Sequence, residues 1–198
     1  TLELKWNTEY LMTALRLASR MIEQFYDSKN GGFYFSSQVH EGLFHHSKNF
    51  FDDATPSGNA VAAKVLLRLG FLTGKLDFVD IAEQMLKSVN THMKSRLDAT
   101  TSLNSVVMEY LQPIDVVILR GFENDLELWQ SKTRKLLKRR AICYAIPESE
   151  SGLPEGLSSK IFEGVIVAYI CHGFSCSKPI NDFKNYQEYL TDSSARAQ

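Results

Sequence analysis

Hydrophobic residues recur at helical spacing near the start of the chain. They are separated by steps of four and three residues: Leu11, Leu15, Ala18, Ile22 and Phe25. This spacing is typical of one buried face of an amphipathic helix. Turn-forming residues occupy positions 27–32, so we expect the helix to end near Tyr26. A short extended piece at Phe33–Phe35 and a long loop over 40–51 should follow.

Three more stripes of the same period follow this loop. We expect a helix from about Pro56 to Leu72 that Gly74 stops, another from about Asp77, and a fourth from Thr101 to Pro113. Their predicted buried faces are, in turn, Val61, Val65, Leu69 and Leu72; Phe78, Ala82, Met85, Val89 and Met93; Val106, Val107, Tyr110 and Leu111. Amphipathic helices with short connections predict antiparallel helical hairpins.

The stretch before the second of these helices carries most of the polar candidates. Thr55 followed by Pro56 predicts the helix start, because a hydroxyl caps free amides and proline fits the first helical position. Gly58 should let another backbone approach. Asp52, Ser57 and Asn59 lie around this start, where amides point outward. They either cap the helix and fix the loop, which we favour, or bind a polar ligand.

The pattern changes to strands at Pro113. Dense β-branched runs predict strands at 114–119, 141–146 and 165–171, with a helix on Leu126, Trp129, Thr133, Leu136 and Leu137 between the first two. The stretch 148–159 reads as a loop and 183–190 as a terminal helix. A strand–helix–strand unit usually forms a right-handed crossover, which predicts a small sheet with a helix on its face. We therefore expect a mainly α fold, with helical hairpins over 1–112 and an α/β unit of about three strands over 113–198.

Composition narrows the class of protein. The 198 residues are 44% hydrophobic and 23% charged, which is ordinary for a globular protein. The net charge of −1 gives no field that would attract nucleic acid or membranes. No apolar run is long enough to span a bilayer, and no signal-peptide pattern is recognisable. Three cysteines favour a reducing compartment, so we expect a cytoplasmic location.

Histidines and cysteines form the other candidate sites. His40, His45 and His46 with Lys48 could act in acid–base chemistry or bind metal, but solvated loop histidines are the simpler interpretation. Cys171 and Cys176, with His172 between them, could be a redox or zinc site, the latter completed by Cys143. We favour a structural role with the two thiols unbridged, and expect no metal and no cofactor.

A cluster of basic residues lies near the end of the predicted helix that begins before Leu126. It comprises Lys132, Arg134, Lys135, Lys138, Arg139 and Arg140. Cations at a helix C-terminus interact favourably with the helix dipole, and no aromatic platform accompanies them. We therefore expect a solvated face and no nucleic-acid binding.

Four motifs in this order carry a family resemblance. They are Asp27-x3-Gly31-Gly32-Phe33-Tyr34; Lys48-x3-Asp52-x3-Pro56-Ser57-Gly58-Asn59; Leu66-x2-Leu69-x2-Leu72-Thr73-Gly74; and Ala168-Tyr169-Ile170-Cys171-x4-Cys176-Ser177-x-Pro179. Over nearly its whole length the chain resembles the C-terminal part of the thioredoxin-domain-containing family of spermatogenesis-associated protein 20 and bacterial YyaL. The sequence departs from the family pattern at His46, Asn49 and Asp53.

The resemblance implies an architecture and two functions. That family couples a thioredoxin-like domain to an α/α toroid similar to N-acylglucosamine 2-epimerases and six-hairpin glycosidases. This chain has no Cys-x-x-Cys motif and few helices, so it should form the last hairpins of the toroid and an α/β appendage.

Two functional hypotheses follow, and whether the chain is an enzyme stays open between them. For this chain we favour a non-catalytic interaction or structural module that assembles as a homo-oligomer or with the rest of the toroid. The alternative is a carbohydrate-binding or sugar-modifying toroid that holds a sugar-like molecule. Its candidate ligand-binding residues are Lys48, Asp52, Ser57, Asn59 and His46.

Overall fold

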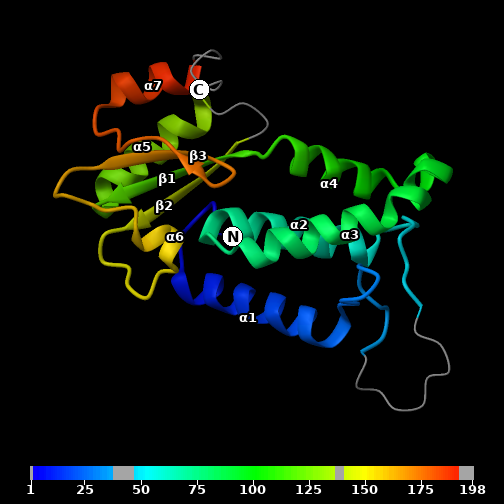
Figure 1. Ribbon diagram of the computed structural model, residues 1–198. Helices are drawn as coiled ribbons and strands as arrows, with labels where there is room; N and C mark the ends of the chain where they lie inside the picture. The colour runs from blue at the N-terminus through cyan, green and yellow to red at the C-terminus, as the bar shows by residue number, and fades with distance from the viewer. Residues whose placement is uncertain (1, 38–46, 137–140, 192–198) are drawn as a thin grey trace. The chain divides into compact units, whose positions relative to one another are not determined.

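The computed structural model describes residues 2–37, 47–136 and 141–191 (Figure 1). They form two compact units. Met12–Pro113 make a helical unit, and Thr1–Leu11 with Ile114–Gln198 make a sheet unit.

The helical unit contains four α-helices in its described residues. These are α1 (Thr8–Phe25), whose first turn belongs to the sheet unit, α2 (Gly58–Thr73), α3 (Leu76–Ser95) and α4 (Thr101–Leu111), with the 3₁₀ turn η1 (Leu97–Ala99) before α4. Only two residues separate α2 from α3, so the two helices pack side by side as a hairpin (Figure 1). The helix periods predicted these elements to within two residues at most ends.

Helix α2 is buried over more of its circumference than the sequence suggested. Leu66 and Leu67 are fully buried, whereas Val61 and Val65, which we predicted to be buried, are 49% and 40% exposed. Small residues allow this, because a Cβ at Gly70 would lie 2.6 Å from the Val79 side chain of α3. The close approach of α2 to α3 determines which face of α2 is buried. The spacing of large apolar residues alone does not predict this approach.

The sheet unit is built on β1 (Asp115–Gly121), its central strand. The strand order is β2-β1-β3-β4, with β2 (Ala141–Pro147) parallel to β1, and β3 (Val167–His172) and β4 (Ser175–Cys176) antiparallel to their neighbours. Between β1 and β2 the chain forms α5 (Glu123–Leu136), as expected for a strand–helix–strand unit. The unit also contains the single-turn α6 (Glu155–Ser158) and α7 (Phe183–Thr191).

One face of this sheet holds the main apolar core of the unit. Val117 and Leu119 of β1 are fully buried against Leu126 and Trp129 of α5 and Tyr186 of α7. Helices α5 and α7 lie on the same side of the sheet and α6 on the other (Figure 1). Inside this core the hydroxyls of Thr133 and Tyr186 are 2.8 Å apart and satisfy each other. Burial raises the pKa of the Tyr186 hydroxyl.

The predicted fold class is therefore wrong in two respects. The described residues contain a four-stranded mixed sheet with a parallel pair instead of about three strands, and they do not show the hairpin repeat of a toroid. An amphipathic stripe indicates that one face of a helix is buried, but it does not indicate which element packs against that face. Strand β4 is only two residues long, too short to give a period in the sequence.

Candidate functional site

The polar residues predicted to surround the start of α2 do lie together in the helical unit, but the helix begins later than expected. Ser57, not Thr55, is the N-cap, and its hydroxyl accepts a hydrogen bond from the Ala60 amide at 3.2 Å. Pro56 thus precedes the cap instead of opening the helix. A Cβ at Gly58 would meet nothing within 4 Å, so the predicted close backbone approach there is also wrong.

Asp52 connects the starts of two helices. One carboxylate oxygen accepts from the Ser57 amide at 2.9 Å, and the other accepts from the Ser102 amide at 2.7 Å. Burial acts to raise the pKa of Asp52, but the hydrogen bonds from Ser102 and Ser57 outweigh it and the pKa lies below its ordinary value. The carboxylate is therefore held ionised, with both oxygens engaged by backbone amides.

Asn59 fixes two loop segments to α2. Its Oδ1 accepts from the Phe33 amide at 2.7 Å, while Nδ2 donates to the Phe33 carbonyl at 2.9 Å and to the Asn49 carbonyl at 3.0 Å. The side chain is buried, and these bonds replace the water it has lost. Asn59 thus aligns the loop before α2 with the turn after α1.

Lys48 is held by the buried carboxylate of Asp27. Its Nζ lies 2.7 Å from Oδ2 of Asp27, donates to the Gly31 carbonyl and sits 4.8 Å from the centre of the Tyr34 ring. Asp27 also accepts from Tyr34, from Asn30 and from the Lys29 amide. The ammonium group of Lys48 contributes most to holding the pKa of Asp27 well below its usual range, against the opposing effect of burial.

The turn at Gly31 and Gly32 makes this arrangement possible. Both residues have positive φ, 71° and 80°, which glycine adopts readily. A Cβ at Gly31 would also lie 3.0 Å from the Gln84 carbonyl oxygen and from the Ser88 side chain of α3. Sequence reasoning treated Asp27 only as a turn residue and a motif position. Its convergence with Lys48 depends on a contact across 21 positions.

A pocket of about 450 Å³ opens in front of α2. Polar groups and aromatic rings share its lining, which comprises Met21, Phe25, Phe33, Tyr34, Phe35, Asn49, Phe51, Asp53, Thr55, Pro56, Ser57, Gly58, Asn59 and Ala62. Asp53 and Thr55 are exposed there, while Asp52 is directed to the helix starts. Of the predicted ligand-binding residues, Ser57 and Asn59 line the pocket, and His46, like His40 and His45, falls outside the described residues.

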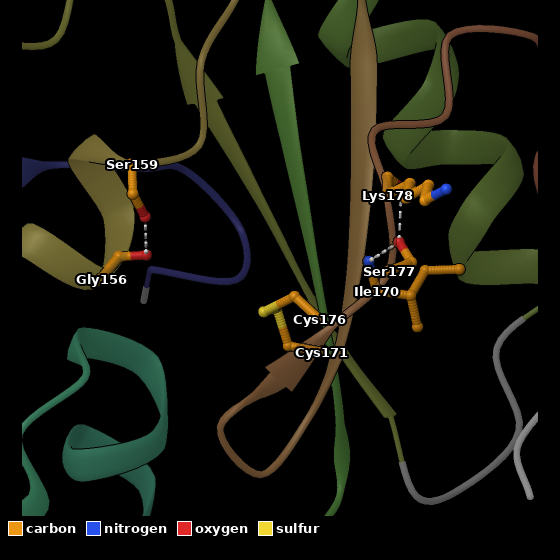
Figure 2. The surroundings of a disulfide bond; sticks show 7 residues. All are labelled: Gly156, Ser159, Ile170, Cys171, Cys176, Ser177 and Lys178. Carbon is orange, nitrogen blue, oxygen red and sulfur yellow. Dashed lines mark hydrogen bonds between the residues drawn. A yellow bond between two sulfur atoms is a disulfide. The ribbon is translucent and has the colours of Figure 1, made fainter. Parts of the chain in front are cut away.

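The cysteines of the sheet unit differ from the expectation. Cys171 and Cys176 are paired across β3 and β4 and joined by a disulfide (Figure 2), so the prediction of unbridged thiols is wrong. The hairpin places them directly opposite each other, which the sequence spacing alone did not reveal. Cys143 lies in the core, where burial raises the pKa of its thiol to about 12, an environment unlike that of a zinc ligand.

Two residues of the basic cluster, Lys132 and Arg134, make contacts within the sheet unit. Lys132 Nζ lies 4.6 Å from the centre of the Phe183 ring, and the Arg134 guanidinium donates to the Glu3 carbonyl. Lys138, Arg139 and Arg140 fall outside the described residues. Across the described ranges, no three His, Cys, Asp or Glu side chains are grouped as metal ligands. None of the helices in those ranges combines the length and apolarity needed to cross a membrane.

Comparison with known proteins confirms the family resemblance. The chain is 27% identical over 194 residues to spermatogenesis-associated protein 20 of Homo sapiens, a match that covers 91% of this chain. The Rattus norvegicus and Mus musculus proteins of the same name are 28% and 27% identical over 195 residues. The match spans 24% of the length of each relative. No protein-family model matches the sequence.

Proposed function

We propose that the helical unit is a non-catalytic binding module whose pocket in front of α2 takes a small polar ligand. One observation carries this proposal: the strongest polar groups near the pocket are committed to hydrogen bonds within the chain. Asp52 receives two backbone amides, Asn59 bonds two loop segments, and Lys48 is paired with Asp27.

Acid–base catalysis would need a different arrangement. A general acid or base must reach the reacting atom and change its protonation state near the working pH. The lowered pKa of Asp52 and the two amides on its carboxylate oppose such a change. Among the described residues that line the pocket, the ionisable side chains are Asp53 and Tyr34. The Tyr34 hydroxyl donates a hydrogen bond to Asp27, which leaves Asp53. A single carboxylate suits binding better than paired acid–base chemistry.

The lining favours a sugar-like ligand as the more specific form of this proposal. Aromatic faces can pack on the apolar face of a sugar ring, and carboxylate, hydroxyl and amide groups can bond its hydroxyls. The pocket offers Phe35 and Phe51 for the first role, and Asp53, Thr55 and Asn49 for the second. Its volume of about 450 Å³ falls in the usual range for small-molecule sites.

Gly58→Ala tests this proposal without disturbing the network. The added methyl group meets no atom within 4 Å, yet Gly58 lines the pocket, so the variant should fold normally and bind less tightly. Wild type and variant should be titrated with a panel of monosaccharides and polyols by nuclear magnetic resonance. We expect a weakening of about tenfold, ~1.4 kcal/mol, for any sugar that binds the wild type.

Two controls complete the experiment. Asp53→Asn should also weaken binding, whereas Asp80→Asn, an exposed carboxylate of α3, should not. The bound sugar should be recovered unchanged after long incubation. Conversion of the sugar by the wild type would contradict a non-catalytic role. If Gly58→Ala binds the sugar as tightly as the wild type does, the ligand does not bind in this pocket.

A further inference from the structure

Three chemically complementary residues lie in a row across the sheet unit. Asp115 of β1 is the register partner of His172 of β3, and His172 is the register partner of Ser175 of β4. Directly opposed residues on neighbouring strands project from the same face of a sheet. An aspartate, a histidine and a serine therefore follow one another on one face.

The first contact in this row is formed. His172 Nδ1 lies 3.1 Å from Oδ1 of Asp115. The Asp115 side chain is 13% exposed and the imidazole 61% exposed. A carboxylate that accepts from Nδ1–H leaves the other ring nitrogen, Nε2, as the acceptor of a neutral imidazole. This is the state that a general base requires.

The β3–β4 hairpin places Ser175 beside His172 on the neighbouring strand. A two-residue turn, with Gly173 at a φ of 58°, holds Ser175 opposite His172. Within the described residues no hydrogen bond occupies the Ser175 hydroxyl. Ser177 provides a contrast, because its hydroxyl accepts from the Ile170 amide and donates to the Lys178 carbonyl (Figure 2).

The disulfide fixes the register of this hairpin. Cys171 and Cys176 form the next pair along the two strands, and their sulfur atoms project to the side opposite Ile170 (Figure 2). Because side chains alternate along a strand, His172 lies on the side of Ile170, away from the disulfide. The cross-link therefore holds His172 and Ser175 opposite each other without blocking them.

A pocket of about 700 Å³ adjoins the row and has room for an acyl group. Asp115, His172 and Ser175 all line it. Ile170, Ile180, Tyr189 and Leu190 give it an apolar wall, and Lys178 adds a cation.

We propose that Asp115, His172 and Ser175 form an acyl-transfer site for small esters with an apolar acyl group. Ser175 Oγ attacks the ester carbonyl carbon while His172 Nε2 takes the hydroxyl proton. The bond from that carbon to the alkoxy oxygen breaks, and His172 returns the proton to the leaving alcohol. Water then attacks the acyl-serine with His172 as base, which releases the carboxylic acid and restores Ser175. Asp115 is a positioning residue that orients the imidazole. This site is independent of the pocket in the helical unit.

Covalent labelling tests the proposal directly. The full chain, kept free of reductant, should be treated with an alkyl fluorophosphonate and its peptides analysed by mass spectrometry. We expect phosphonylation at Ser175, and p-nitrophenyl acetate hydrolysis that is lost in Ser175→Ala. Ser131→Ala, which removes an exposed hydroxyl of α5, should behave as wild type.

Two further variants separate chemistry from folding. His172→Gln should slow labelling about 100-fold or more, the size of a general-base contribution. Asp115→Asn should lower kcat at least about tenfold with KM unchanged, which a loss of folding would not produce. Melting temperatures of the variants should match that of the wild type. Absence of labelling at Ser175 in the folded wild type, or equal labelling in His172→Gln, would overturn the proposal.

Discussion

Asp27 is the residue on which the loops of the helical unit converge. Its carboxylate gathers the turn after α1, the Tyr34 hydroxyl and the Lys48 ammonium within one buried cluster. Removal of one partner of a buried ion pair leaves the other charge without compensation, which typically costs about 3–5 kcal/mol. The motif Asp27-x3-Gly31-Gly32-Phe33-Tyr34 is thus explained by packing, with no ligand required.

Asp27→Asn should remove a pH-dependent part of the stability. The pKa of Asp27 is lowered in the folded protein, so its contribution is full above the unfolded value of about 3.9 and is lost as the pH falls further. Urea unfolding from pH 6 to pH 2.5 should show a wild-type advantage that is largest near pH 6 and shrinks below about pH 4. A difference that is the same at every pH would contradict the ionised state of Asp27.

A matched control is the exposed ion pair of Arg96 and Asp98. Hydrogen bonding to Arg96 contributes most to lowering the pKa of Asp98, but both side chains are largely exposed and water screens the pair. Asp98→Asn should therefore give a much smaller pH-dependent change than Asp27→Asn.

At the scale of elements, periodicity predicted the helices well and their starts less well. The stripes of α3 and α5 are buried as expected at Phe78, Val89, Leu126 and Trp129. The start of α2 was misplaced because Thr55 and Ser57 are both acceptable caps, and only the loop path that Asp52 fixes selects Ser57. The local sequence shows which residues could cap the helix. It does not show the tertiary contact that determines which of them does.

The β3–β4 hairpin was missed because β4 has only two residues and gives no period in the sequence. Cys171 and Cys176 become neighbours only when β3 and β4 are aligned, which their spacing along the chain does not show. The candidate site was likewise predictable in its residue types but not in their partners. Of the predicted residues Asp52, Asn59 and Lys48, only Asn59 lines the pocket. Each of the three is directed to a backbone group or an ion partner.

Counting thiols tests the hairpin. In denaturant without reductant, the chain should react with one equivalent of a thiol reagent, at Cys143, because Cys171 and Cys176 are joined. After reduction three thiols should react. In the folded protein Cys143 should react slowly, because it is buried and its pKa is raised to about 12. Three fast thiols before reduction would contradict the disulfide.

For the whole molecule, we still expect a homo-oligomer, because α2 carries exposed apolar side chains that a second copy could cover. Val61 and Val65 lie on the exposed side of the helix and adjoin a groove of about 410 Å³ that Val106 of α4 also lines. We expect light scattering with size exclusion to show a dimer or larger assembly that the double variant Val61→Asp, Val65→Asp dissociates. Lys94→Asp, at an exposed position of α3 outside the groove, changes the net charge equally and should leave the assembly intact. A wild-type monomer at high concentration would contradict this expectation.

We propose that the polar residues around the start of α2 hold the helical unit together and do not perform chemistry. Asp52→Asn is the sharpest test, because asparagine keeps one acceptor oxygen where the carboxylate supplies two. One of the Ser57 and Ser102 amides then loses its partner, which costs about 1–3 kcal/mol. Urea unfolding should show that loss in Asp52→Asn and no loss in Asp53→Asn. An Asp52→Asn variant with wild-type stability that no longer binds a sugar bound by the wild type would contradict this structural role.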